Sequence, residues 1–169
     1  MTGRARHPGQ KKDRPRGVQS RRPGVFERTA KAAGAFVCDD CGVVQHAGKW
    51  SWGAPPLTEL AGGRCPACQR IRERYPAGTI RLHPAFLEHR EEIKQLARNV
   101  EQAEKAEHPL ERLMEMQESE GDLVITTTGI HIARQIAHKL ARRFHQRARL
   151  RYADDEGLVH VDWVAEPEA

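Results

Sequence analysis

Short apolar runs open the chain's hydrophobic pattern, and longer helical stretches follow them. Ala35-Phe36-Val37 and Val43-Val44 predict two strands on either side of a cysteine pair. Farther on, Ile71 and Ile80 flank a Tyr-Pro-Ala-Gly turn, which predicts a third strand next to the first two. We expect these strands to form one small sheet within residues 32–83.

A helical period begins at His83-Pro84, because proline can occupy the first position of a helix without losing a hydrogen bond. The apolar residues after it recur at helical spacing and define one packing face: Phe86, Ile93, Leu96, Ala97, Val100, Ala103 and Ala106. Pro109 interrupts this pattern and predicts the start of a second short helix, which would carry Leu110, Leu113, Met114 and Gln117. We interpret residues 84–120 as a helical connector.

The next predicted helix has two distinct faces. Leu123–Thr127 precedes it as a β-branched strand, and Thr128 is a natural N-cap for a helix from Gly129 to about Arg147. Its apolar residues fall on one arc: Ile130, Ala133, Ile136, Ala137, Leu140, Ala141 and Phe144. Polar and basic residues fall on the opposite arc: His131, Arg134, Gln135, His138, Arg142 and His145. One face therefore packs, and the other is cationic.

Two further strands complete the carboxy-terminal part of the chain. Ala148–Tyr152 and Leu158–Val164 alternate polar and apolar residues around a turn at Asp154–Gly157, which predicts an antiparallel pair. Residues 121–169 thus form a β-α-β-β unit with a basic helix, and we expect Val159–Val164 to lie at an edge of its sheet. The predicted fold class is α+β.

Composition adds a fourth region, a basic tail over residues 1–31. Only 5% of the 169 residues are aromatic and 30% are charged, so apolar area is scarce. The tail contains ten Lys/Arg and two acids and has almost nothing to bury, which predicts disorder. Two interpretations stay open for it: contact with nucleic-acid phosphates, or a merely solubilising role.

All four cysteines fall into two pairs, Cys38-x-x-Cys41 and Cys65-x-x-Cys68. Four thiolates in two such pairs match the closed tetrahedral site of structural zinc. Disulfides and a redox or iron–sulfur role are the alternatives, but a redox pair requires a thioredoxin-like strand and helix that the sequence does not indicate. We therefore predict a zinc ribbon over residues 32–83 that holds one structural Zn²⁺.

Aromatic and basic residues of the ribbon are candidates for nucleic-acid contact. Lys49, Trp50 and Trp52 lie in a Gly-rich loop between the cysteine pairs. The tryptophans either stack on bases or, as is more common beside a small zinc site, cover the sulfur ligands. Arg70 and Arg72 follow the second pair, where phosphate contact and ordinary solvated surface are equally good interpretations.

Charge segregation along the chain points to a second candidate surface. Residues 84–122 carry five bases and eleven acids, whereas residues 123–152 carry seven Lys/Arg and no acid, although the whole chain has a net charge of only +5. An ordinary solvated face mixes charges of both signs, so we interpret the basic helix and the strand after it as a phosphate-contacting surface. Its residues are His131, Arg134, His138, Arg142, Arg149 and Arg151.

No arrangement typical of an enzyme occurs in the sequence. The histidines of the basic helix recur every seven residues, which separates them by roughly 10.5 Å, too far for one metal ion. Neither a His-Glu-x-x-His motif nor a Gly-rich phosphate loop between a strand and a helix is present. The chain also lacks an apolar run long enough for a membrane span and an export signal, which together with reduced cysteines predicts a cytoplasmic protein.

Six motifs occur together within residues 36–163: Cys-x-x-Cys-Gly, Gly-Lys-Trp, Cys-Pro-x-Cys, Tyr-Pro-Ala-Gly, His-Pro-Leu-Glu-Arg and Thr-Thr-Gly-Ile-His-Ile-Ala-Arg. Their combination resembles small bacterial zinc-ribbon relatives of the archaeal and eukaryotic adaptor for nuclear export of the large ribosomal subunit. The resemblance implies binding to that subunit, with the ribbon and the basic helix touching rRNA. This chain has one set of four cysteines where the adaptor family typically has two, and a bacterial cell has no use for export, which leaves ribosome or RNA binding as the implied function.

The sequence therefore predicts a non-enzymatic, RNA-binding protein that acts in assembly, quality control or storage of the large ribosomal subunit. Its expected partners are rRNA and ribosomal proteins, with no membrane and no small-molecule substrate. The competing hypothesis is a protein-interaction scaffold or transcriptional accessory factor, whose ribbon binds a partner protein and whose acidic segments face a basic one.

Overall fold

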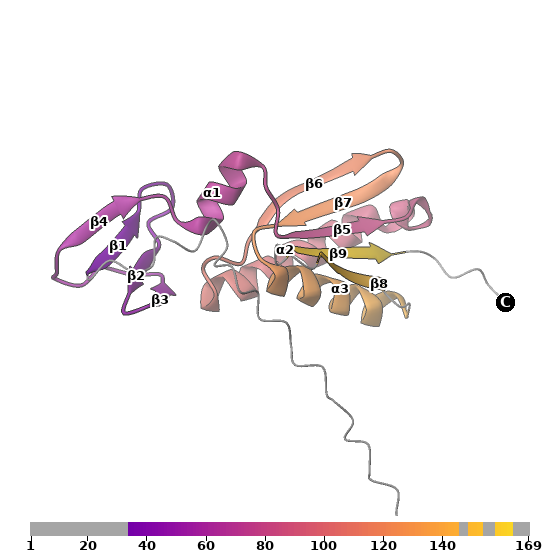
Figure 1. Ribbon diagram of the computed structural model, residues 1–169. Helices are drawn as coiled ribbons and strands as arrows, with labels where there is room; N and C mark the ends of the chain where they lie inside the picture. The colour runs from indigo at the N-terminus through magenta and orange to yellow at the C-terminus, as the bar shows by residue number, and fades with distance from the viewer. Residues whose placement is uncertain (1–33, 146–148, 154–157, 164–169) are drawn as a thin grey trace, which may run out of the picture.

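The computed structural model describes residues 34–145, 149–153 and 158–163, and it describes side chains for residues 34–145, 160 and 161. These residues form two separate sheets that one helix connects, and further helices pack against the second sheet (Figure 1). The mixture of helices and strands confirms the predicted α+β class. The predicted tail, residues 1–31, and the turn at residues 154–157 lie outside the described residues.

The first sheet belongs to the cysteine module, residues 34–74. Its four strands have the order β3-β2-β1-β4 and are β1 (Ala35–Cys38), β2 (Val44–His46), β3 (Lys49–Ser51) and β4 (Leu60–Gly63). Strand β1 pairs antiparallel with β2 and parallel with β4. Helix α1 (Pro66–Glu73) follows β4 and begins at the second cysteine pair.

The second sheet has five strands in the order β6-β7-β5-β9-β8. In chain order these are β5 (Gly78–Leu82), β6 (Leu113–Ser119), β7 (Asp122–Thr127), β8 (Arg149–Ala153) and β9 (Leu158–Trp163). Strands β5 and β9 run parallel, and the other neighbours are antiparallel. The order β7-α3-β8-β9 agrees with the predicted β-α-β-β unit. The prediction of an edge strand at Val159–Val164 is wrong, because β9 lies between β5 and β8.

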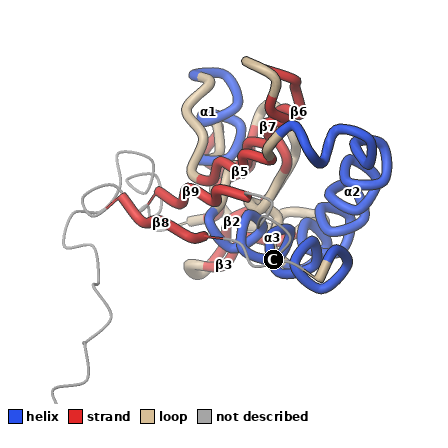
Figure 2. Tube along the Cα trace, turned by 90° about the vertical axis from the view of Figure 1, so that its right-hand side faces the viewer, coloured by secondary structure: helices blue, strands red, loops and turns tan. Residues whose placement is uncertain are grey.

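Helices cover one face of the second sheet, as Figures 1 and 2 show. They are the 3₁₀ helix η2 (Pro84–His89), α2 (Arg90–Glu107) and α3 (Ile130–Phe144). Their apolar sides and one face of the sheet form a single core that includes Ile80, Leu82, Phe86, Ile93, Leu123, Ile125, Ile132, Ile136 and Leu140. The predicted packing arc of α3 is confirmed, whereas Ala103 and Ala106 of α2 are exposed. None of the described helices has the length and apolar character that crossing a membrane requires.

The prediction of a third strand beside the cysteine pairs is wrong. Ile71 lies in α1, and Ile80 lies in β5, the central strand of the second sheet. Strand β5 pairs with β7 on one side and with β9 on the other. Both partners are distant in sequence, so the local pattern predicts a strand without revealing which sheet it joins. The boundary between the two sheets accordingly precedes residue 78, not residue 84.

The prediction of a second short helix after Pro109 is also wrong. Leu113–Ser119 is strand β6, which pairs with β7 from Leu113 opposite Thr127 to Ser119 opposite Asp122. A tight turn at Glu120-Gly121 joins them, and both turn residues have positive φ. Such a turn selects a hairpin, and the pairing with β7 overrides the weak helical spacing of the apolar residues.

Residues 108–112, the bridging segment, connect α2 to β6 and contact three parts of the molecule. Thr128 fastens the segment: its hydroxyl donates to the Leu110 carbonyl at 2.6 Å and accepts from the Arg112 N–H at 2.9 Å. The prediction that Thr128 caps α3 is therefore wrong. Gly129 occupies the N-cap position, and the Glu111 carboxylate instead accepts the free Ile132 N–H of the first helical turn at 2.9 Å.

Glu111→Ala is expected to destabilise the fold by about 1 kcal/mol, because it removes both a hydrogen-bond acceptor and a negative charge from the start of α3. Thermal unfolding followed by circular dichroism measures the change. Glu111→Gln is the matched control: its amide oxygen can still accept the hydrogen bond, so its loss should be smaller. Equal stability of the alanine variant and the wild type would contradict the capping role.

Candidate metal centre

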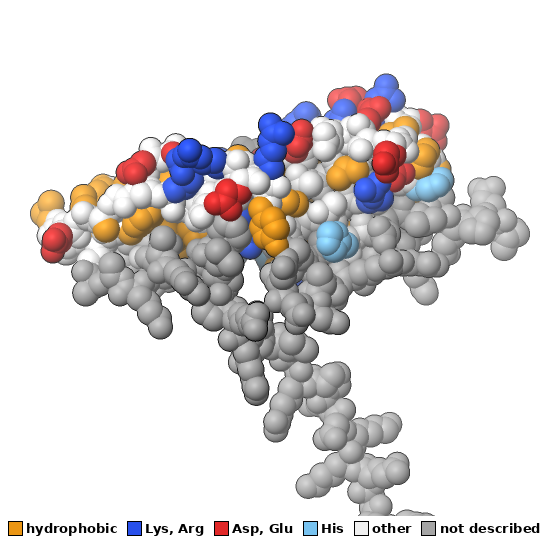
Figure 3. Space-filling view, turned by 45° about the horizontal axis from the view of Figure 1, so that its top comes forward, with side chains coloured by type: hydrophobic (Ala, Val, Ile, Leu, Met, Phe, Trp, Pro, Cys, Tyr) orange, Lys and Arg blue, Asp and Glu red, His pale blue; other side chains and the backbone are white. Residues whose placement is uncertain are grey.

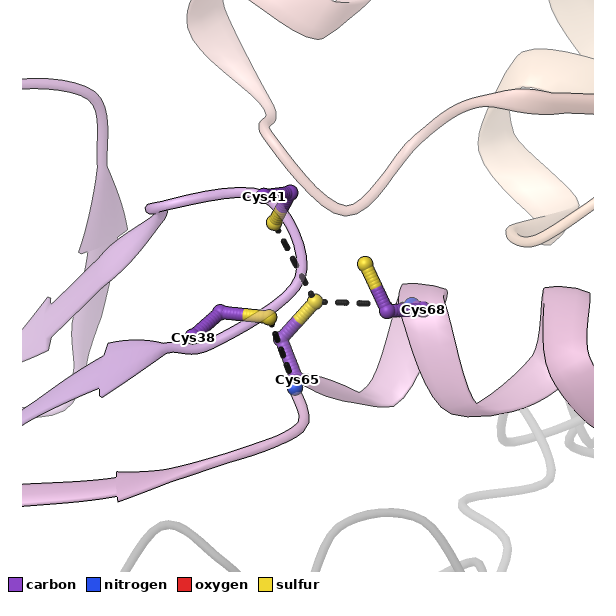
Figure 4. A group of neighbouring side chains, drawn as sticks. All are labelled: Cys38, Cys41, Cys65 and Cys68. Carbon is purple, nitrogen blue, oxygen red and sulfur yellow. Dashed lines mark hydrogen bonds between the residues drawn. The ribbon is translucent and has the colours of Figure 1, made fainter.

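Two structural elements bring the four cysteines together in the cysteine module. Cys38 is the last residue of β1, and Cys41 follows in the turn after it. Cys65 is the N-cap of α1, with Pro66 at the first helical position, and Cys68 lies in the first turn. All four sulfurs converge on one point, as Figure 4 shows, and lie within 4.8 Å of one another.

The spacing of the sulfurs fits a tetrahedral metal site. The Sγ atoms of Cys41 and Cys65 lie 3.8 Å apart. A disulfide would require about 2.05 Å. Four sulfurs placed about 2.3 Å from a zinc ion at the corners of a tetrahedron are about 3.8 Å apart. All four cysteines are free thiols, so the cluster that the sequence predicts is a group that can hold a metal ion such as zinc.

Backbone N–H groups and burial shift the pKa values of the thiols in opposite directions. Burial alone would raise the pKa of Cys38, but N–H groups of Cys65, Cys41 and Asp40 stabilise its thiolate and lower the pKa to about 7. Burial raises the pKa of Cys65, and it raises that of Cys68 to about 11. The second pair therefore resists ionisation without a cation, and metal binding must displace its protons.

Arg112 of the bridging segment is the functional residue that the sequence did not indicate. Its guanidinium donates to the sulfur of Cys41 at 3.2 Å, of Cys68 at 3.4 Å and, more weakly, of Cys65 at 3.9 Å. The Nε–H donates to the Pro109 carbonyl at 2.7 Å, and the residue is only 6% exposed. The bridging segment, which connects α2 to β6, thus also places a buried cation beside the thiols.

The charge of Arg112 complements that of the cluster. Burial lowers the pKa of a guanidinium, but the hydrogen bond and charge of Cys41, then the charge of Cys65 and the hydrogen bond to Cys68, outweigh burial and raise the pKa of Arg112. A divalent ion on four thiolates would leave two negative charges, which one buried guanidinium partly offsets. Arg112 lies 44 residues beyond Cys68, so no local spacing points to it.

The two tryptophans lie in packed positions around this centre. Trp50 is half-buried and meets Phe36 edge to face, with ring centroids 5.7 Å apart. Trp52 is 38% exposed; its indole N–H donates to the Lys105 carbonyl at 2.7 Å, and the Arg112 guanidinium lies 5.3 Å from its ring centroid. These contacts fasten the module to α2 and favour the structural interpretation of the tryptophans over base stacking.

The other predicted nucleic-acid contacts occupy several surfaces. Arg70 covers the Tyr75 ring at 5.6 Å and donates to the Tyr75 carbonyl, and Arg72 is exposed on α1. On α3, the four predicted residues are all exposed: His131, Arg134, His138 and Arg142. In β8, Arg149 lies opposite the acid Asp162 of β9, and Arg151 lies opposite His160.

One groove brings parts of both predicted surfaces together. Lys49 and Trp50 of the module and His131 of α3 line a groove of about 660 Å³. Its lining also includes His108, Pro109 and Leu110 of the bridging segment and the acids Glu107 and Glu111. The cysteine module and α3 therefore form one continuous surface at this groove.

Comparison of the chain with protein-family models, with curated proteins and with solved structures finds no match. A function therefore has to be inferred from the sites and surfaces of the molecule itself.

Proposed function

We propose that the cysteine module is a zinc ribbon and that the protein is a non-enzymatic RNA-binding protein of the large ribosomal subunit. One structural Zn²⁺ would be held by Cys38, Cys41, Cys65 and Cys68. The ion would stabilise the folded state of a module that has few apolar residues of its own.

The zinc proposal is supported by the donor set and by its surroundings. Four thiolates leave no coordination position for a substrate, as is usual in structural sites. Backbone N–H groups and the Arg112 guanidinium surround the sulfurs with hydrogen-bond donors, which is how thiolate sites are stabilised beyond the metal itself.

The RNA proposal is carried by one observation, the cationic outer face of α3. The helix has four Lys/Arg and no acid, and its apolar face packs against the core, so the basic residues are directed away from the core. The face of the molecule seen in Figure 3 instead mixes acidic and basic side chains. A helix with no acid of its own suits a polyanion, although Glu104 and Glu92 of α2 pair with His131 and Arg143 at its border. The groove that Lys49 and His131 line, together with Glu107 and Glu111, connects this face to the module.

Ribosomal RNA is the proposed partner because of the motif resemblance. The motifs His-Pro-Leu-Glu-Arg and Thr-Thr-Gly-Ile-His-Ile-Ala-Arg meet in space through Thr128, Glu111 and Arg112. Sedimentation of a cell extract tests this partner: the protein should migrate with large subunits or whole ribosomes and leave them after RNase treatment. Recovery in the soluble fractions alone, in every growth phase, would argue for the protein-scaffold hypothesis.

Arg134→Glu combined with Arg142→Glu is expected to lower affinity for rRNA fragments by about tenfold or more and to flatten its salt dependence, because two phosphate contacts become repulsive. Gel shifts at several salt concentrations measure both quantities. Circular dichroism should show an unchanged fold, since both positions are exposed.

Arg90→Glu combined with Lys94→Glu is the matched control, because it changes the net charge equally on the acidic helix α2. This control should retain most of the wild-type affinity. Equal losses in the two double variants would show that only net charge matters, and an absence of rRNA binding at low salt would reject the proposal.

A further inference from the structure

A second group of metal-ligating side chains lies where α2 ends and α3 begins. Glu104 is in the last turn of α2, His108 is its C-cap, and His131 is in the first turn of α3. One carboxylate oxygen and one ring nitrogen from each histidine all lie within 4.8 Å of one another. None of the three belongs to the cysteine cluster.

The backbone holds two of the three residues in fixed relation. His108 follows Glu104 by four residues, and its N–H donates to the Glu104 carbonyl at 2.7 Å, so both side chains leave the same side of the helix end. The rings of His108 and His131 lie edge to face with centroids 5.7 Å apart. The bridging segment, fastened by Thr128 and Glu111, determines how α2 approaches α3.

The separation of the ligand atoms matches a small divalent ion. Nε2 of His131 and Oε2 of Glu104 lie 3.2 Å apart. Ligand atoms about 2.0–2.1 Å from a tetrahedral zinc are about 3.3 Å from each other. This pair therefore already has the required spacing, and a ring nitrogen of the exposed His108 lies within 4.8 Å of both atoms.

The surroundings leave the remaining coordination positions accessible. His108 and His131 are exposed, and both line the groove of about 660 Å³ between the cysteine module and α3. Three protein ligands with an open position are typical of sites that keep an exchangeable water, in contrast to the closed set of four thiolates. Two imidazoles and one carboxylate favour zinc and similar transition-metal ions over magnesium or calcium.

We propose that Glu104, His108 and His131 bind one divalent transition-metal ion of the zinc, cobalt or nickel type, separate from the cysteine site. The ion joins the end of α2 to the start of α3 and completes its coordination with water from the groove. This site does not depend on RNA binding or on a ribosomal role.

Cobalt binding to the full-length, zinc-loaded protein without a polyhistidine tag tests the proposal. Equilibrium dialysis followed by elemental analysis should find one bound Co²⁺ per chain while the zinc is retained. Its visible spectrum should lack the thiolate-to-cobalt charge-transfer bands in the near ultraviolet, because its ligands are nitrogen and oxygen. His131→Ala and His108→Ala should each lose this cobalt and keep the zinc.

His138→Ala is the matched control, since His138 is an exposed histidine on the same face of α3 but outside the cluster. It should bind cobalt as the wild type does. Circular dichroism should show that all variants are folded. The proposal is overturned if the wild type binds no cobalt beyond its zinc, if the cobalt spectrum shows thiolate bands, or if His131→Ala binds cobalt unchanged. In that case His131 and Glu104 form only a surface ion pair.

Discussion

Cys65→Ser is expected to abolish tight zinc binding and to unfold the cysteine module while the α/β core stays folded. Only six buried residues form the module's own core, and three of them are the cysteines Cys38, Cys65 and Cys68. Structural zinc contributes about 10–16 kcal/mol in small modules, so loss of one ligand exceeds what this core can replace. Serine is nearly isosteric and caps helices well, so the substitution changes metal binding and leaves the start of α1 intact.

Zinc content and tryptophan fluorescence measure this outcome. Trp50 and Trp52 both lie in the module, so their emission should shift on its unfolding, whereas the helical circular dichroism of α2 and α3 should persist. A strong chelator should reproduce the change in the wild type. Asp39→Asn, next to a ligand but outside the cluster, is the control and should keep its zinc. A Cys65→Ser protein with full zinc content and native fluorescence would disprove the metal site.

Arg112→Met is expected to lower zinc affinity by about 10- to 100-fold and to destabilise the fold by about 3–5 kcal/mol. Methionine keeps much of the side-chain volume but removes the cation and its donors to three sulfurs and to the Pro109 carbonyl. The thiolates would then carry an uncompensated buried charge. Metal competition titrations and thermal unfolding measure the two effects separately.

Two further variants separate charge from geometry at this position. Arg112→Lys keeps the positive charge but cannot direct a planar fork of donors at several sulfurs, so an intermediate loss is expected. Arg64→Ala removes an arginine that is also near the cysteines but pairs with Asp40 at the surface. Its effect should be much smaller, because solvent screens that pair. Wild-type zinc affinity and stability in Arg112→Met would show that Arg112 only fills space.

Local sequence patterns predicted the parts of this protein that depend on near neighbours. The two cysteine pairs require only a turn and a helix start to present their sulfurs, and the structure brings all four together. The buried arc of α3 follows from its period alone, because residues three and four positions apart lie on the same face of a helix. Each cysteine pair spans four residues and α3 spans 15, so both patterns are local in the sequence.

Long-range pairing decided the parts that the sequence did not predict. Strand β5 joins the second sheet through β7 and β9, and β6 forms a hairpin where helical spacing suggested a helix. Thr128 has the chemistry of a helix cap, but the bridging segment offers its hydroxyl stronger partners, and Glu111 takes over the capping. In each case, contacts with a distant segment outweighed the local structural preference.

By itself the sequence determined the α+β class, the four-thiol cluster and the cationic face of α3. Only the tertiary structure decided which groups share each site. Arg112 contacts the thiols from the segment that follows α2, and His131 at the start of α3 lies beside Glu104 and His108 at the end of α2. The reason is physical: ligand spacing within one turn follows from backbone geometry, whereas the approach of distant segments follows from how the whole core packs.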